Sequence, residues 1–563
     1  MKSAYKWMLL TFGVISIIKI ALSYFVAAPT IFADEYVYSK MAEGIHQKLF
    51  ADWDSPIEMA YPPAYPILIS FAYFFDNMAV VYFIIKILNA LMSTTILIPA
   101  YLLFREFFDE KISRNGALLV AVAPFSFATA PYIMSENLFA PLFLASTYLI
   151  LKALNENRTL YPILAGVFTG LTILTRYIGF VLLIGAITGL LSRENRLAKL
   201  KKLVIAAFVA AVIVLPFIVL SYFSGEAVTD LVSSTIVANK SSNGLLFNTL
   251  AFILWGMAHA AYLLLASGGL LWLYALTAQG KDEKGKSLVL ITFTMIFSMI
   301  LVLSKRALNL GVKEITPFAW LPGRIIGRYI DFFIPLIIVI GYFGLMRKDK
   351  ETAPSTLTLT LASLILFAGS LLFYFPLFPF NNLSLSFFGA VKTGLEYFLS
   401  GNLVFDYVSP TTLLLVSAST ISVLWIFRQL MKKSVLTAKR VFVATLVFFL
   451  ISSSVSYGAT MYNSQKWNND EQMILGRYIN ELEGGGRLLF DERNCKDRIT
   501  MGNETSLCRK NGSGNFIGFW TKREIIVTSV EEARKGDLVV TRESLDYSLI
   551  KETSGGIKLY RKD

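Results

Sequence analysis

The feature that most constrains the fold is a succession of long apolar runs separated by short charged stretches. A run of about 17–25 apolar residues is long enough to cross a lipid bilayer as an α-helix. Hydrophobic residues make up 55% of the 563 residues and charged residues only 16%. The sequence therefore predicts a polytopic α-helical membrane protein and excludes a soluble globular fold. We expect about 13 transmembrane helices, at Trp7–Ala28, Met78–Phe104, Asn115–Ala130, Ser135–Leu154, Leu160–Thr175, Ile178–Leu191, Leu203–Phe223, Leu250–Leu276, Ser287–Leu303, Ile326–Met346, Ser355–Phe375, Pro410–Phe427 and Val441–Tyr457.

The distribution of Lys and Arg between alternate loops predicts the orientation. The richer set of loops includes the N-terminus and residues 192–202 and is expected to face the cytoplasm. The segment Pro29–Pro66 and the C-terminal tail then lie outside, in a multi-pass protein of the cell (plasma) membrane. The fifth and sixth runs are short and meet at Thr175-Arg176-Tyr177. They fit either two thin crossings or one hairpin that only enters the membrane. The net charge of +13 comes largely from cytoplasmic loops and the tail, so it indicates no nucleic-acid partner.

One outer segment, Leu303–Arg328, breaks this charge rule because it is basic on the disfavoured side. It contains Lys305, Arg306, Lys313, Arg324 and Arg328. Two readings remain open at this point. These side chains either extend to outer-leaflet phosphates, or they form an anion site at the membrane boundary. Guanidinium groups one helical turn apart suit phosphate oxygens and favour the second reading.

The composition changes sharply after residue 459, which predicts a boundary between a transmembrane domain (1–459) and an extracytoplasmic α/β domain (460–563). Apolar runs shorten to strand length there. Cys495 and Cys508 are the only cysteines of the chain; in an oxidising outer compartment we expect them to form a disulfide. Asn503 and Asn511 begin possible glycosylation sequons. The expected strands are Arg487–Phe490, Glu524–Val527, Leu538–Thr541 and Ile557–Tyr560, with helices at Asp470–Glu483 and Val530–Lys535.

The first outer segment, Pro29–Pro66, is rich in carboxylates, and Asp34 and Glu35 stand at the membrane–water boundary. Carboxylates near hydrocarbon are costly to ionise, which suits them to act as bases. The alternative is that Asp34 only caps an amphipathic helix over Tyr36–Leu49. The motif Tyr61-Pro-Pro-Ala-Tyr-Pro66 predicts a rigid extended bend that holds the segment against the bundle.

These motifs, in this order and sidedness, resemble the GT-C class of glycosyltransferases, which use lipid-phosphate-linked sugars. The likeness is to the branch of protein O-mannosyltransferases and aminoarabinose (ArnT-like) transferases, and it covers roughly the first 345 residues. It implies a GT-C-like fold and transfer of a hexosyl or pentosyl group, with inversion, from a polyprenyl- or dolichyl-phosphate to an acceptor hydroxyl on the outer face. The residues that carry it are Asp34-Glu35, Tyr61-Pro-Pro-Ala-Tyr-Pro66, Ser135-Glu136-Asn137, Leu174-Thr175-Arg176 and Gly327-Arg328-Tyr329.

The resemblance also implies roles for single residues. A hydroxyl nucleophile needs a base within hydrogen-bond reach, and Asp34 is the candidate, with Glu35 beside it. The leaving lipid phosphate needs preorganised cations. The candidates are Arg176, Arg324 and Arg328, with Lys305 and Arg306 as weaker ones.

Contacts to the substrate are expected from three further residues, Glu136, Tyr61 and Tyr329. Glu136 stands at the outer end of its helix, where it either binds sugar or acceptor hydroxyls or is a satisfied helix-end carboxylate. The implied partners are the lipid-phosphate-linked sugar, an acceptor that is a protein, a glycan or a lipid, and the surrounding membrane lipids.

Evidence for a metal cofactor is thin. Weak candidate ligands are Glu58 and His259, and Asp52-Trp53-Asp54 is a D-x-D pattern that is common by chance. The aminoarabinose branch has a glutamate two residues before its Pro-Pro pair, whereas this chain has Ala60 there. A divalent metal therefore stays an open alternative.

Two rival functions come from other classes. A transporter gathers polar residues near the bilayer midplane; here only Lys19 and Lys86 lie inside the apolar runs, and both side chains are long enough to reach the boundary. A binding or assembly protein that holds a lipid-linked sugar without transferring it is the other rival, and it predicts tolerance of changes at Asp34.

Overall fold

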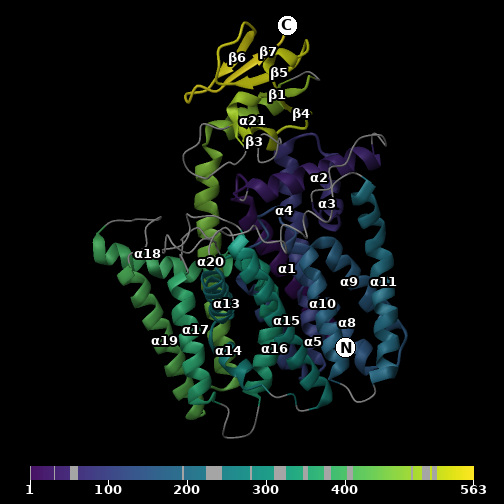
Figure 1. The fold of residues 1–563 in the computed structure, drawn as a ribbon, viewed down its shortest axis with the longest axis vertical. Helices are drawn as coiled ribbons and strands as arrows, with labels where there is room; N and C mark the ends of the chain where they lie inside the picture. The colour runs from purple at the N-terminus through teal and green to yellow at the C-terminus, as the bar shows by residue number, and fades with distance from the viewer. Residues whose placement is uncertain are drawn as a thin grey trace. The chain divides into compact units, whose positions relative to one another are not determined.

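The computed structural model describes most of the 563 residues. The described residues are 2–563 except 31, 51–60, 193–195, 224–243, 279, 281, 310–324, 347–352, 373–381, 402–409, 483–485, 497–506 and 510–515. Within them the chain is mostly helical, with a small sheet near the C-terminus (Figure 1).

The apolar runs form helices of the predicted kind. Among the described residues, eight helices are long and apolar enough to cross a membrane: Ala4–Tyr24, Met78–Arg105, Glu136–Asn155, Arg196–Val219, Leu246–Ala266, Glu283–Ala307, Leu414–Lys432 and Ala438–Asn468. Five shorter apolar helices accompany them: Ala64–Phe74, Leu160–Thr175, Tyr177–Leu191, Asp331–Leu345 and Thr356–Gly369. The polytopic α-helical class is confirmed, and the count of thirteen spans stays a prediction.

The chain divides into two compact units. Unit 1 comprises Met1–Lys19, Leu91–Thr129 and Ser135–Ala459, and unit 2 comprises Ile20–Ala90, Ala130–Met134 and Thr460–Asp563. The first outer segment, with Asp34 and Glu35, therefore belongs to the same unit as the C-terminal domain. Parts of α1 (Lys2–Tyr24), α4 (Met78–Thr94) and α20 (Ala438–Asn468) fall in each unit.

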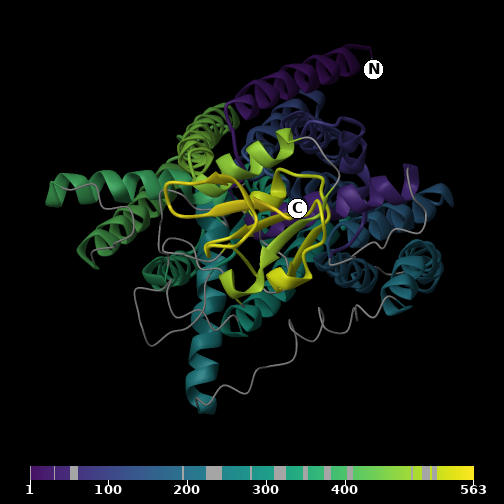
Figure 2. The same ribbon diagram turned by 90° about the horizontal axis from the view of Figure 1, so that it is seen from above.

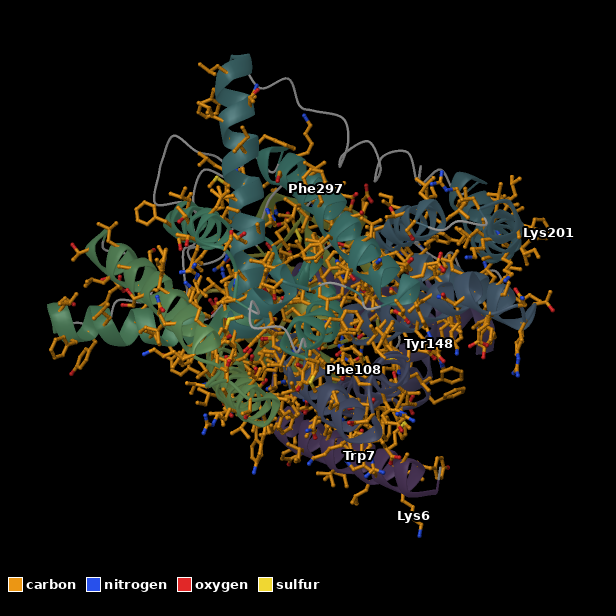
Figure 3. All side chains as sticks on the ribbon, turned by 90° about the horizontal axis from the view of Figure 1, so that it is seen from below. Lys6, Trp7, Phe108, Tyr148, Lys201 and Phe297 are labelled. Carbon is orange, nitrogen blue, oxygen red and sulfur yellow. A yellow bond between two sulfur atoms is a disulfide. The ribbon has the colours of Figure 1, made fainter. Side chains whose placement is uncertain are left out.

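Unit 1 is a helical bundle. Its helices pack side by side: α9 (Leu160–Thr175) lies between α8 (Glu136–Asn155) and α11 (Arg196–Phe223), and α14 (Leu270–Leu276) packs on α16 (Ile334–Leu345) (Figure 1). Seen from below, Phe108 and Tyr148 lie among the packed side chains, whereas Lys201 and Phe297 lie nearer the edges (Figure 3). The elements are α5 (Leu97–Arg105), α6 (Glu110–Val122), α7 (Pro124–Phe127), α8 (Glu136–Asn155), α9 (Leu160–Thr175), η2 (Tyr177–Phe180), α10 (Val181–Leu191), α11 (Arg196–Phe223), α13 (Leu245–Ala266), α14 (Leu270–Leu276), α15 (Glu283–Asn309), η3 (Gly327–Tyr329), η4 (Asp331–Phe333), α16 (Ile334–Leu345), α17 (Thr356–Leu372), η5 (Leu383–Leu385), α18 (Ser386–Ser400) and α19 (Pro410–Lys432).

The break between the fifth and sixth apolar runs is sharp. Helix α9 ends at Thr175, and Arg176 is extended, with φ −155° and ψ 135°. A single 3-10 turn, η2, then leads directly into α10. Because Arg176 leaves the helical path at this point, it stands at the end of α9.

The two lysines inside the apolar runs are held within the protein and do not extend to its surface. In unit 1, Lys19 is fully buried and donates to Ser93 Oγ and to the carbonyl of Ser126, both at 2.9 Å. In unit 2, Lys86 donates to the carbonyls of Ser23 (2.9 Å) and Val26 (2.7 Å). Ser23 stands in the last turn of α1 and Val26 just beyond it, where helix oxygens lack intrahelical partners, so Lys86 caps the C-terminal end of that helix.

The C-terminal domain of unit 2 contains a mixed five-stranded sheet in the order β4-β1-β5-β7-β6. Strand β1 (Leu488–Asp491) pairs in parallel with β4 (Ile525–Thr528) and β5 (Leu538–Thr541), while β7 (Lys558–Arg561) is antiparallel to β5 and β6 (Ser548–Glu552). Figure 2 looks onto this domain, with its last strands in yellow. Strand β6 was not predicted, and the expected helix at Val530–Lys535 is only the 3-10 turn η7 (Val530–Glu532).

Apolar residues are buried on both faces of the sheet: the larger cluster includes the two cysteines, and a smaller one on the opposite face includes Leu489 and Val539. Cys495 and Cys508 form a disulfide with their Cα atoms 4.6 Å apart, between the short strands β2 (Cys495–Lys496) and β3 (Cys508–Arg509). Helix α21 (Glu471–Glu481) and the short helix α22 (Phe516–Phe519) pack on each other. Both predicted sequons lie outside the described residues.

Candidate active site

The carboxylate site of unit 2 is built at the start of α2 (Phe32–Phe50). Asp34 and Glu35 stand in the first turn of this helix, where the helix dipole stabilises negative charge. The helix begins before Asp34, so Asp34 lies inside the first turn and not ahead of it, as a capping residue would. Helix α2 is also longer than the predicted Tyr36–Leu49.

Asp34 is held by the tyrosine that opens the proline bend. The hydroxyl of Tyr61 donates to Asp34 Oδ1 at 3.0 Å, and Asp34 is half-buried. Tyr38 packs against both Tyr61 and Tyr65, with ring centroids 5.0 and 5.2 Å apart. The bend thus returns to the start of α2, and Tyr61 contacts the candidate base. The prediction of an extended bend over Tyr61–Pro66 is wrong for its second half, because helix α3 (Ala64–Ile69) already begins at Ala64.

Glu35 has a different environment from Asp34. It is fully buried, and its two oxygens accept different backbone N–H groups: Oε2 from Thr30 and Oε1 from Ile133, each at 2.9 Å. A carboxylate that takes backbone N–H bonds on both oxygens is a rigid connector. Glu35 joins Thr30, just before α2, with the segment Ala130–Met134.

The cationic site of unit 1 begins at the first turn of α8. Glu136 Oε1 lies 2.6 Å from Arg176 Nη1 and 3.6 Å from Arg328 Nη1. Arg176 Nη1 also donates to Ser135 Oγ at 3.1 Å. All three charged side chains are largely buried, with 10–13% of their surface exposed. The Ser135-Glu136 and Thr175-Arg176 motifs and Arg328 therefore meet in one place.

Three guanidinium groups surround the ring of Tyr329. The distance from the guanidinium carbon to the ring centroid is 4.7 Å for Arg176, 4.7 Å for Arg306 and 5.2 Å for Arg328. Arg306 Nη2 also lies 3.4 Å from the Tyr329 hydroxyl. Faces of aromatic rings attract cations, but three like charges around one ring repel each other. The cluster is therefore preorganised to attract an anion.

The backbone that carries Arg328 and Tyr329 is fixed by hydrogen bonds to residues on either side of it in the sequence. The N–H of Gly327 donates to Asn382 Oδ1 at 2.7 Å, and the Tyr262 hydroxyl donates to Asp331 Oδ2 at 3.0 Å. A Cβ atom at Gly327 would clash with the Tyr262 ring. Asp331 is buried and close enough to Glu136 to interact with it electrostatically. Even with Asp331 counted, cations outnumber carboxylates in this cluster, which we call the arginine cluster (Glu136, Arg176, Arg306, Arg328, Tyr329 and Asp331).

Sequence reasoning missed Tyr262, Asp331 and Asn382. Asp331 carries the one available signal, because an acid at the start of a long apolar run is costly unless it is paired. Tyr262 and Asn382 lie 69 and 55 residues from their partners, and neither belongs to a motif.

The other predicted site residues are distributed as follows. Lys305 is half-buried on α15 beside Arg306, and no ion pair joins it to a carboxylate of the described residues. His259 is buried in unit 1 and hydrogen-bonds through Nδ1 to the carbonyl of Trp255 at 2.7 Å. Arg324 and Glu58 lie outside the described residues, as does Asp52-Trp53-Asp54. In the described part of the chain no group of three or more His, Cys, Asp or Glu could hold a metal ion.

Comparisons with known proteins place this geometry in context. Residues 61–220 match the family model "Dolichyl-phosphate-mannose-protein mannosyltransferase", and no curated protein matches the chain in sequence. The crystal structure of ArnT from Cupriavidus metallidurans bound to undecaprenyl phosphate is similar over 98% of this chain and 97% of its own, with 12% identity and a TM-score of 0.58. Its apo state gives a TM-score of 0.56 at 12% identity, over 99% and 98% of the two chains.

A more distant similarity is to the oligosaccharyltransferase of Archaeoglobus fulgidus, with 13% identity and a TM-score of 0.42 over 94% of this chain and 65% of that one. The predicted likeness to GT-C glycosyltransferases is confirmed. The chain has the GT-C glycosyltransferase fold along nearly its whole length, and residues 61–220 carry the sequence pattern of the dolichyl-phosphate-mannose-protein mannosyltransferase family.

Proposed function

We propose that this protein transfers a hexosyl or pentosyl group from a polyprenyl- or dolichyl-phosphate to an acceptor hydroxyl, at the extracytoplasmic face of a cell membrane. The glycosyltransferase fold supports the reaction class, and the ArnT structure named above holds undecaprenyl phosphate. The excess of Lys and Arg in the opposite loops supports the orientation, with the N-terminus cytoplasmic and the C-terminal domain outside.

The single observation that carries the proposal is the arginine cluster. Arg176, Arg306 and Arg328 surround Tyr329, with Glu136 as the carboxylate that orients two of them. A lipid phosphate gains negative charge as its bond to the sugar breaks, and preorganised guanidinium groups stabilise that charge more strongly in the transition state than before it. Their planar donor groups also suit phosphate oxygens.

Asp34 is the proposed base. In one displacement, the acceptor oxygen attacks the anomeric carbon, its proton passes to Asp34, and the bond from that carbon to the phosphate oxygen breaks. The phosphate leaves with the electron pair, and attack from the opposite side inverts the anomeric centre. Glu35 is better suited to positioning, because both of its oxygens already accept backbone N–H groups. One of these belongs to Ile133, three residues before Glu136 in the sequence.

The test uses the purified full-length protein in lipid nanodiscs, with undecaprenyl phosphate as the binding probe and a panel of polyprenyl-phosphate sugars as donors. Asp34→Asn is expected to abolish transfer and to retain the lipid phosphate with near-normal affinity. Arg176→Gln and Arg328→Gln are expected to weaken lipid-phosphate binding. Transfer by Asp34→Asn within a few-fold of the wild type would remove Asp34 as the base.

Two further outcomes would contradict the proposal. Tight retention of the lipid phosphate with no transfer from any donor would indicate a lipid-linked-sugar binding protein. Normal lipid-phosphate affinity in both arginine variants would refute the anion site.

A further inference from the structure

We propose that a short segment of the C-terminal domain, residues 516–522, is a positioning element for the candidate base, because it fastens α2 and its neighbour η1 (Ser70–Phe74). We call it the docking segment. It contains α22 and the residues Trp520, Thr521 and Lys522, and α22 contacts both α2 and α21. This inference rests on the proposed role of Asp34, and all the contacts below lie within unit 2.

Lys522 fastens the docking segment to η1. Its ammonium group donates to the carbonyls of Phe75 (2.7 Å) and Tyr73 (3.2 Å). These carbonyls belong to the end of η1 and the residue after it, where backbone oxygens lack helical partners and attract cations. The nearby Asp76 is fully exposed, so its 3.8 Å ion pair with Lys522 adds little.

A second lysine makes the reciprocal contact from α2. Lys40 donates to the carbonyl of Thr521 at 2.7 Å and to Glu43 Oε2 at 2.7 Å. Neighbouring residues of the docking segment therefore accept from α2 and donate to η1. The Tyr73 hydroxyl of η1 also contacts α2 directly, because it lies 2.6 Å from the carbonyl of Ser39. Helix α2 is thus held at residues 39 and 40, within about two turns of Asp34.

An apolar anchor supports these polar contacts. Trp520 is buried, its indole N–H lies 2.8 Å from the sulfur of Met473, and its ring packs against Tyr82 at 6.0 Å. The guanidinium of Arg477 stands 4.4 Å above the Trp520 ring and donates to the carbonyl of Ala27 at 3.3 Å. Buried aromatic side chains with a satisfied polar atom are typical anchors of an interface. The same anchor thus reaches the chain just before α2.

The chemical consequence concerns the orientation of Asp34. A general base must be held within a fraction of an ångström of its productive position, and a misplacement of about 1 Å costs about 100-fold in rate. Because Asp34 and Lys40 share one helix, loosening the docking segment leaves the first turn of α2 with fewer restraints, chiefly the contacts of Glu35 and Tyr61, so Asp34 is held less closely to its position. The turnover rate then falls, while the affinity for a lipid phosphate held by the arginine cluster does not change.

The experiment compares Lys522→Met and Lys40→Met with Lys522→Arg, in the full-length protein in nanodiscs. Lys535→Met is the matched control, because Lys535 is an exposed lysine of the same domain. The first readout is hydrogen exchange of the α2 amides without any donor, and it is independent of activity. We expect exchange in α2 to rise about tenfold in both methionine variants, to return toward the wild-type rate in Lys522→Arg, and to stay unchanged in Lys535→Met.

The second readout separates kcat from the dissociation constant of undecaprenyl phosphate. We expect kcat to fall about tenfold in Lys522→Met and the dissociation constant to stay within twofold. Unchanged exchange in α2, or a rise that extends equally to the amides of β1 and β5, would overturn the proposal, since the second result marks general unfolding. A raised KM for the acceptor together with normal α2 exchange would overturn it in favour of an acceptor-binding role. If the wild type transfers no sugar, the proposed function fails, while the exchange readout still decides whether the segment fastens α2.

Discussion

Replacement of Arg306 by glutamine is the most direct test of the arginine cluster, because this side chain contributes charge with little structural role. Arg306 contacts Tyr329 through its guanidinium plane and through one 3.4 Å contact with the hydroxyl. Within the described residues it forms no ion pair with a carboxylate, unlike Arg176 and Arg328, which share Glu136. Its removal is therefore expected to weaken ligand binding without destabilising the empty protein.

The magnitude follows from the positions of the charges. A phosphate about 5 Å from the guanidinium gains about 3 kcal/mol at an effective dielectric constant near 20. Arg306 is only half-buried, so screening by water reduces this to about 2 kcal/mol. That corresponds to about a 30-fold rise in the dissociation constant of undecaprenyl phosphate. The guanidinium groups of Arg176 and Arg328 share the Tyr329 ring with that of Arg306, so the deletion also relieves repulsion between like charges.

The assay measures binding of undecaprenyl phosphate to the full-length protein at two salt concentrations, together with the thermal midpoint of the empty protein. Arg306→Gln should bind about 30-fold more weakly, depend less on salt, and melt no lower than the wild type. Lys201→Gln removes the same charge at an exposed position of α11 and should match the wild type. Normal affinity in Arg306→Gln, or a lower midpoint with unchanged affinity, would refute the assignment of this residue to the anion site.

Three further predictions concern other contacts. Tyr61→Phe removes a hydrogen bond that positions Asp34 and is worth about 1 kcal/mol, so kcat should fall about fivefold; an unchanged kcat would contradict this contact. Gly327→Ala forces its new Cβ against Tyr262, so binding of undecaprenyl phosphate should weaken and the thermal midpoint should fall through a cost of about 1–3 kcal/mol; a variant with wild-type values would contradict the packing. Burial alone would raise the pKa of Asp537, but hydrogen bonds from Arg487 and from the backbone N–H groups of residues 534 and 487 outweigh it and hold this pKa below its ordinary value. The carboxylate therefore stabilises the C-terminal domain above the unfolded pKa of about 4, and this contribution is lost as the pH falls through the lower folded value; Asp537→Asn should flatten that part of the stability profile measured by circular dichroism, and an unaltered acid dependence would exclude this carboxylate as its source.

The fold class was readable from the sequence because a membrane imposes a minimum length on each apolar run. A break between helices could also be predicted where a charged residue separates two apolar runs. The junction at Arg176 interrupts two apolar runs, and it is the place where α9 ends. Strand β6 escaped prediction because its Ser548–Glu552 sequence is mostly exposed and shows no apolar alternation.

The candidate site was readable only in part. The acids and arginines stood out because charges at a membrane boundary are costly without a role. The positioning role of Glu35 could not be predicted, because one of its partners is a backbone N–H 98 residues away. The contact between Lys40 and Thr521 spans 481 residues and ends on a carbonyl. No residue type marks such a partner, so only the folded chain reveals it.

The docking segment has a consequence for how this protein diverges among species. The three contacts that Lys40 and Lys522 make there end on main-chain oxygens of Thr521, Tyr73 and Phe75, which every amino acid supplies. The lysine contacts therefore place no demand on the side chains at positions 75 and 521, whereas position 73 still needs its tyrosine hydroxyl for the contact with Ser39. A joint of this kind leaves no correlated substitutions in an alignment, so methods that infer proximity from covariation would overlook one of the closest links between distant parts of the chain.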